Sequence, residues 1–181
     1  MTTHSLRGIR LTLALVGAAV STCQVSMAQQ TEQDVKAAFI YNFTKYVAWP
    51  SSVFESGASP IVVGEVGADS LDGALESTLG SRTVDGRRFV VKHFHWGQDL
   101  SGCQVLFVPS SEMSSASQLS QLKDRPVLVI GESPGFAKRF GIINFVLDAN
   151  HLRFEINAQA AREAGLTISS KLLTLGKPPG G

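Results

Sequence analysis

The histidine pair His93 and His95 is the first feature of the sequence that could do chemistry. Both residues fall in the run RRFVVKHFHW, which is typical of a strand, and alternate residues of a strand point to the same side of a sheet. The two imidazoles would therefore share one face, as two metal ligands do. A zinc or copper site needs at least a third ligand at bonding distance, so we expect structural or solvent-facing histidines and no metal.

A second candidate is the segment GESPG, residues 131–135, which follows an apolar run. Because α/β proteins bind ligands beyond the carboxyl ends of strands, Glu132 and Ser133 are candidate contacts for a small ligand; a plain turn is the competing interpretation. The segment also matches the G-x-S-x-G pattern of hydrolases. Pro134 has no N–H to act as oxyanion donor, so we rank a hydrolase that uses Ser133 last.

The cysteines add little to the case for an enzyme. Cys103 begins the apolar run CQVLFVPS, which predicts a buried, inert thiol; an intermolecular disulfide or a reactive thiol is the alternative. No Ser-His-Asp or Cys-His order stands out along the chain. We therefore expect no catalytic activity and no cofactor.

The first 28 residues have the pattern of a secretory signal peptide. Arg7 and Arg10 precede an apolar run over residues 11–20, and a small-x-small pattern, SMA, ends at Ala28. The run is shorter than the roughly 20 apolar residues of a transmembrane helix. A retained signal anchor and a lipoprotein attached through Cys23 are the alternatives. We predict secretion, with cleavage after Ala28.

Cleavage there would leave 181 minus 28, or 153, residues, which is enough for one domain. Loss of the two leader arginines would leave 14 basic against 15 acidic residues, a net charge of −1. Neither nucleic acid nor an anionic membrane surface is expected as a partner. We predict one domain over residues 29–177, with a sizeable core because 44% of the chain is hydrophobic, and a disordered tail over residues 178–181.

A helix is predicted near the start of this domain. The segment TEQD from Thr31 resembles a capping box, and Pro50 should stop the helix. Helical spacing gives this segment one apolar face. The residues of that face are Val35, Ala38, Phe39, Phe43, Tyr46 and Val47.

Apolar runs and helical patterns alternate along the rest of the chain. Strands are expected within residues 60–66, 87–96, 103–109 and 126–132, and helices within residues 69–79, 114–122, 158–164 and 169–175. Two extended runs around the turn-rich DANH, residues 148–151, predict a β-hairpin. The fold class that follows is α/β: a three-layer α/β/α single domain with a mostly parallel central sheet and a late antiparallel hairpin.

Aromatic residues are concentrated in YNFTKYVAWP, residues 41–50. Packing of the first helix on the sheet accounts for Phe43 and Tyr46, since each large ring removes about 150–250 Å² from water. Tyr41 and Trp49 lie off the apolar face and are candidates for a protein interface, where aromatics are enriched. Packing of these two residues in the core is the competing interpretation.

Two long stretches resemble the signature segments of the YfiR-like family of periplasmic regulators. They are VKAAFIYNFTKYVAWP, residues 35–50, and VLVIGESPGFAKRFGIINFVLDANHLRFEINAQAAREAGLTISSKLLTL, residues 127–175. The resemblance implies a periplasmic protein that represses a membrane-bound diguanylate cyclase by contacting its periplasmic domain. Binding would lower cyclic-di-GMP and, with it, biofilm formation. A periplasmic small-molecule sensor or carrier is the alternative function.

The same resemblance implies contact residues on the hairpin and the helix that follows it. Carried over to this chain, they are Phe154, Glu155, Ile156, Ala161 and Arg162. Exposed aromatics would also permit a homodimer.

The chain departs from the family pattern in two places. Some relatives are tuned by disulfides, which Cys103 alone cannot form within the mature chain. Phe140 precedes Gly141 where relatives tend to have a glycine pair, and a positive φ there would strain Phe140.

Overall fold

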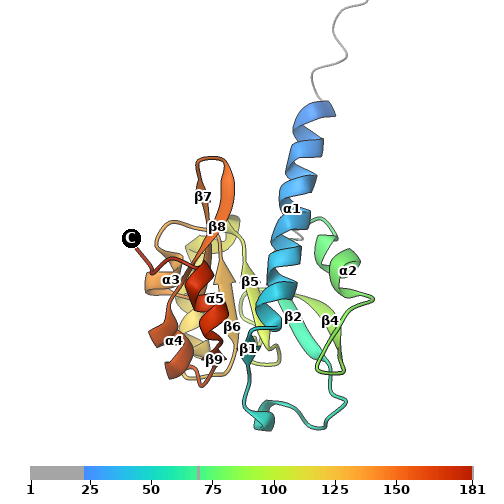
Figure 1. Ribbon diagram of the computed structural model, residues 1–181, viewed down its shortest axis with the longest axis vertical. Helices are drawn as coiled ribbons and strands as arrows, with labels where there is room; N and C mark the ends of the chain where they lie inside the picture. Colours follow the sequence, from blue (N-terminus) through green and yellow to red (C-terminus); the bar gives the residue numbers. More distant parts are fainter. Residues whose placement is uncertain (1–22, 69, 181) are drawn as a thin grey trace, which may run out of the picture.

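The computed structural model of the protein describes residues 23–68 and 70–180 and is centred on a seven-stranded sheet (Figure 1). The strand order is β3-β4-β2-β5-β6-β7-β8. The strands are β2 (Ile61–Val66), β3 (Thr83–Val84), β4 (Arg87–Phe94), β5 (Val105–Val108), β6 (Leu128–Gly131), β7 (Ile143–Asp148) and β8 (His151–Ile156). Strands β4, β2, β5, β6 and β7 run parallel, and β3 and β8 pair antiparallel at the two edges. The predicted mostly parallel sheet with a late hairpin is confirmed.

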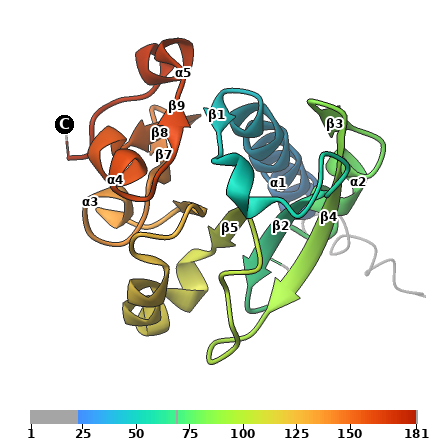
Figure 2. The same cartoon turned by 90° about the horizontal axis from the view of Figure 1, so that it is seen from below.

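Helices lie on both faces of this sheet (Figure 2). The helices α1 (Cys23–Thr44) and α2 (Ala74–Leu79) cover one face, and the 3-10 helix η2 (Ser110–Leu122) and α3 (Phe136–Arg139) cover the other. The chain ends with α4 (Ala158–Glu163) and α5 (Ser170–Leu175). Between them lies β9 (Thr167–Ile168), which pairs antiparallel with β1 (Val47–Ala48); the short helix η1 (Ser51–Val53) follows β1. The predicted α/β/α layering is confirmed.

Two hydrophobic clusters fill the spaces between the layers. Strand β5 shows how one apolar run serves both clusters: Val105 and Phe107 belong to the first, under α1, while Leu106 and Val108 belong to the second, under η2. All four side chains are fully buried. A central parallel strand is covered on both faces, which is why it reads as continuously apolar.

Cys103 lies in the second cluster with 1% of its surface exposed. Its Sγ donates a hydrogen bond to the Leu100 carbonyl oxygen at 3.1 Å. Burial raises the pKa of the thiol to about 12, because desolvation disfavours the thiolate. The predicted burial is confirmed, and a thiol of this kind is chemically inert at neutral pH.

The first helix differs from its predicted limits at both ends. It begins at Cys23, so the TEQD segment lies inside α1; the reason is that residues 23–44 contain no proline or glycine to interrupt the helix. It ends at Thr44, before Pro50, because Val47 pairs with Ile168 in the β1–β9 ladder. Within the predicted leader, residues 1–22 lie outside the described residues, and the predicted cleavage point after Ala28 falls within α1.

The buried face of α1 is also rotated from the predicted one. Ala37 and Ile40 are fully buried against the sheet, whereas Val35 is 39% exposed. Phe39 and Phe43 point toward the β7–β8 hairpin, where both rings contact Phe154. Packing against a sheet on one side and a hairpin on another sets this rotation, and helical spacing alone does not contain that information.

The β7–β8 hairpin forms as predicted, with Asp148 opposite His151. Its two loop residues, Ala149 (φ 47°) and Asn150 (φ 66°), both adopt left-handed conformations. This is the two-residue turn whose twist matches the flanking strands. The predicted strain at Phe140 is absent, since its φ is −132°.

Smaller corrections concern short elements. The predicted helix over residues 69–79 is helical only from Ala74, which follows Gly73 in a left-handed conformation. The helix predicted over residues 114–122 is a 3-10 helix and begins at Ser110. Strand β3 and helix α3 were not predicted, because elements of two and four residues carry too little periodicity.

Candidate protein-interaction site

A groove of about 670 Å³ lies where the chain leaves α1, and we call it the β1–β9 groove. Its lining residues are Thr44, Lys45, Tyr46, Val47, Ala48, Trp49, Ser51, Phe54, Ile61, Val84, Asp85, Arg87, Thr167, Ser169 and Lys171. They come from the end of α1, β1, η1 and the loop after it, the start of β2, the β3–β4 hairpin, β9 and the start of α5, several of which are far apart in the sequence. The β1–β9 pairing therefore assembles this groove.

Trp49 lines the groove and is held in place by its own polar group. The indole Nε1 donates a hydrogen bond to the Gln104 carbonyl oxygen at 3.1 Å, while the ring packs against the first hydrophobic cluster. The side chain is partly buried. An aromatic ring fixed in one orientation can bind a partner with little loss of conformational entropy.

Tyr41, the other aromatic candidate, lies beside the groove among cations. The Arg82 guanidinium is 4.5 Å and the Lys45 Nζ is 5.5 Å from the centre of its ring. The ring also meets Phe89 edge-on at 5.9 Å between ring centres. Tyr41 does not itself line the groove: it is partly buried against the first hydrophobic cluster, and Lys45 is the residue that both contacts its ring and lines the groove.

The charges along the groove are mostly positive. Lys45, Arg87 and Lys171 line it against a single acidic residue, Asp85. Arg87 is fixed by stacking on Phe54, 3.8 Å from the ring centre, and its Nη1 donates to two backbone carbonyl oxygens at 2.7 and 2.8 Å. Complementary potentials steer association and choose partners, so this surface suits an acidic one.

Three of the contact residues implied by the family resemblance lie in the core. Phe154 and Ile156 are 6% exposed and Ala161 is 1% exposed, all within the first hydrophobic cluster. Strand alternation turns Phe154 and Ile156 inward toward α1. A partner cannot reach these side chains while the domain is folded, so they act through packing.

Glu155 and Arg162, the other two, are accessible to different degrees. Arg162 is exposed on α4. Glu155 is partly buried, and its carboxylate accepts hydrogen bonds from Asn144 Nδ2 at 3.3 Å and from the Gly180 N–H at 3.2 Å. Neither residue lines the β1–β9 groove.

Lys177, which directly precedes the tail predicted to be disordered (residues 178–181), lies along β8. The Ile156 N–H donates to the Lys177 carbonyl at 2.8 Å, and the Lys177 N–H donates to the Phe154 carbonyl at 3.0 Å. Lys177 Nζ also bonds Asp148 at 2.7 Å, a contact that lowers the pKa of Asp148. Residues 179 and 180 form a turn. This segment covers part of an edge strand that would otherwise offer free backbone groups.

Glu132 follows the carboxyl end of β6, where a ligand contact was predicted, and there it joins two helices. Its carboxylate accepts from Lys36 Nζ of α1 at 2.7 Å and from the Ser110 N–H of η2 at 3.0 Å. Ser133 is 7% exposed. Ligand binding by Glu132 and Ser133 stays a prediction, but these protein donors already occupy the Glu132 carboxylate.

The Lys36–Glu132 pair predicts a loss of stability at high pH. Desolvation lowers the pKa of Lys36, but hydrogen bonds and charges from Glu132 and Glu32 outweigh it and raise the pKa overall. A raised pKa stabilises the fold below the unfolded-state value of about 10.4, and this stability is lost as pH rises through the folded-state pKa. We expect Lys36→Met to lower the free energy of unfolding at pH 7 by about 1–2 kcal/mol and to weaken the alkaline loss.

Urea denaturation at pH 7, 10 and 11 measures this effect, with Lys92→Met as the matched control. Lys92 is exposed on β4, so its replacement should change stability little at any of these pH values. Identical pH profiles for wild type and Lys36→Met would contradict the role given to the pair.

His93 lies near the end of β4, His95 directly follows the strand, and the two histidines contact different partners. His93 Nε2 lies 3.0 Å from a carboxylate oxygen of Glu76, and its Nδ1 lies 3.9 Å from Glu65. The His95 backbone N–H donates to Gln98 Oε1. Within residues 23–68 and 70–180, the side chains that could ligate a metal do not form a group of three or more. In the same ranges, no helix is long and apolar enough to cross a membrane.

The fold and this surface define the class of protein: a single α/β/α domain with an aromatic, cation-lined groove assembled by the β1–β9 pairing. Residues 33–177 match the model of the YfiR/HmsC-like family. The chain belongs to this family, as the two resembling segments predicted. A comparison with curated proteins found no match.

Proposed function

We propose that this protein is a periplasmic regulator that represses a membrane-bound diguanylate cyclase by contacting the cyclase's periplasmic domain. The observation that carries the proposal is family membership over residues 33–177, because at family level it points to periplasmic regulators of diguanylate cyclases. Export through a cleaved N-terminal signal peptide and a regulatory role without catalysis belong to the same proposal.

The β1–β9 groove is the contact face in this proposal. Tyrosine, tryptophan and arginine are enriched at binding hot spots, and the groove and its margin contain Tyr41, Trp49 and Arg87. The excess of cations favours an acidic segment of the cyclase's periplasmic domain. A homodimer through the same face is the competing use, and the size of the purified protein in solution distinguishes the two.

Deleting the gene in a strain that contains the cyclase tests the regulatory role. Cellular cyclic-di-GMP and biofilm should both rise, and an intact copy that keeps its leader should restore them. A copy that lacks residues 1–28 should fail to restore them, since it would stay in the cytoplasm. Unchanged cyclic-di-GMP after deletion, with the cyclase expressed, would count against the proposal.

Trp49→Ala is expected to weaken binding of the cyclase's periplasmic domain about 30-fold, the effect of losing roughly 2 kcal/mol at a hot spot. Trp96→Ala is the matched control, because Trp96 is a partly buried tryptophan that packs on the second cluster. Binding measured by interferometry at equal folded fractions should be near wild type for this control. Equal weakening by both variants would remove the groove from the proposal.

A charge reversal separates binding from packing in the same experiment. Lys171 is exposed at the groove, so Lys171→Glu should slow association, and more so at low salt, without changing stability. Lys123→Glu, at an exposed lysine outside the groove, is the matched control. Association rates that are the same for both variants would argue against electrostatic docking at the groove.

A further inference from the structure

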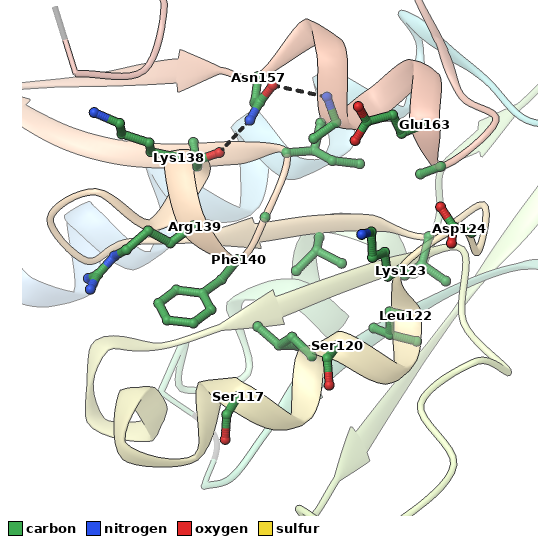
Figure 3. A pocket seen from close by; sticks show the side chains of 18 residues that line it. Ser117, Ser120, Leu122, Lys123, Asp124, Lys138, Arg139, Phe140, Asn157 and Glu163 are labelled. Atoms are coloured by element: carbon green, nitrogen blue, oxygen red, sulfur yellow. Dashed lines mark hydrogen bonds between the residues drawn. The ribbon is translucent and has the colours of Figure 1, made fainter.

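A second cavity, on the other face of the sheet, has no part in the proposed contact with a cyclase (Figure 3). It has a volume of about 430 Å³ and lies between η2, α3 and α4. Pockets that bind small molecules fall between about 300 and 1,000 Å³. An apolar cavity of about 150 Å³ holds one benzene, so on that scale this cavity could take up to roughly 17 non-hydrogen atoms.

The interior of the cavity is mostly apolar. Leu122, Val129 and Ile142 line it, and Ala160 of α4 adds a small side chain that leaves the space open. Asn157 lines it too, but its Nδ2 donates to the Ala137 carbonyl at 2.8 Å and its Oδ1 accepts from the Ala160 N–H at 2.9 Å. With that amide already satisfied, an apolar group displaces water from this interior at a net gain.

Charged side chains stand at the margins, and they are unevenly distributed. Lys138 and Arg139, at the end of α3, lie on one side of the cavity in Figure 3, and Lys123, Asp124 and Glu163 lie on the other. The Arg139 guanidinium is 5.0 Å from the centre of the Phe140 ring, and both residues line the cavity. The α3 side has a formal charge of +2 and favours a negative group, whereas one lysine and two carboxylates leave the opposite side with a formal charge of −1.

We propose that this cavity binds an amphipathic monoanion of about 12–15 non-hydrogen atoms in all, with an apolar body and one carboxylate. The body fills the space over Val129 and Ile142, and the carboxylate lies at Lys138 and Arg139. The opposite side, with two carboxylates against Lys123, disfavours a second negative charge. This makes the domain a small-molecule sensor or carrier, through residues other than Glu132 and Ser133.

Decanoate, with twelve non-hydrogen atoms, is the probe, and decanol and decylamine are its neutral and cationic counterparts. Titrations of the full mature domain followed by methyl NMR should give saturable shifts at Leu122, Val129 and Ile142. Decanoate should bind at least threefold tighter than decylamine. The double variant Lys138→Gln/Arg139→Gln should weaken decanoate about three- to tenfold and leave decanol unchanged, which a general loss of structure would not do.

Two further variants locate the site. Ala160→Phe should fill the cavity and abolish the shifts from all three probes. Arg162→Gln, which removes an exposed cation of α4 that does not line the cavity, should leave decanoate binding unchanged. If Ala160→Phe fails to fold, the double variant Lys138→Gln/Arg139→Gln tests the site by itself, because its substitutions do not change the core.

Three outcomes would overturn the inference: no saturable binding of decanoate, shifts confined to the β1–β9 groove, or decylamine binding as tightly as decanoate. Each leaves the proposed cyclase contact untouched, because that contact is measured with Trp49 and Lys171 on the other surface.

Discussion

Phe43→Ala is expected to lower the free energy of unfolding by about 3–5 kcal/mol, the usual loss when a buried phenylalanine is truncated. The ring is 1% exposed. Its centre lies 4.9 Å from that of Phe154, 5.8 Å from that of Phe145 and 5.9 Å from that of Phe39. Truncation therefore leaves a cavity at the point where α1 meets the β7–β8 hairpin, and the loss approaches the total stability of an ordinary domain.

Urea denaturation followed by circular dichroism measures this loss at pH 7. Leu147→Ala is the control, since Leu147 is 66% exposed near the tip of the same hairpin and its truncation should change stability by less than about 0.5 kcal/mol. A loss below about 1 kcal/mol for Phe43→Ala would show that the ring cluster does not hold the helix to the hairpin.

Gly131→Ala is expected to destabilise the domain by about 2–3 kcal/mol. A Cβ at Gly131 would overlap the ring of Phe136, and a Cβ at Gly141 would overlap the same ring from another side. Phe136 is fully buried, so its ring lies in a slot that exists only because these two residues have no side chains. Overpacking of this kind moves the ring off its preferred rotamer or shifts β6.

The double variant Gly131→Ala/Phe136→Leu tests this explanation. If the methyl group clashes with the ring, Gly131→Ala should cost at least 1 kcal/mol less in the Phe136→Leu background, as measured in a double-mutant cycle. Gly57→Ala is the matched control, because a Cβ there meets nothing within 4 Å and φ is not positive; its effect should be small or stabilising. If the effects of Gly131→Ala and Phe136→Leu on the free energy of unfolding are additive, the proposed clash between the new methyl group and the Phe136 ring is wrong.

The slot also explains part of the GESPG segment. Its first glycine makes room for Phe136, and its last, Gly135, adopts a left-handed conformation (φ 71°) just before α3. Glu132 joins α1 to η2. Three of the five residues in this segment, which resembled a ligand loop or a nucleophile elbow, therefore stabilise the fold. A five-residue match of this kind is better evidence for a local backbone conformation than for a catalytic or ligand-binding site.

The sequence by itself determined the elements whose signals are local. The apolar runs became buried parallel strands, the DANH segment became the hairpin turn, and Cys103 became a buried thiol. Burial on both faces of a strand and left-handed turn residues each leave a pattern within a few consecutive positions. Such patterns need no knowledge of the rest of the fold.

The tertiary structure alone decided which surfaces remain for function. Lys36 and Glu132, 96 positions apart, form an ion pair, and Val47 pairs with Ile168 to build the groove that Trp49 lines. Packing against α1 took Phe154 and Ile156 into the core and out of reach of a partner. The physical reason is the same in each case. These outcomes depend on contacts between distant segments, and the hydrophobic periodicity of one segment does not predict which distant segment it will contact.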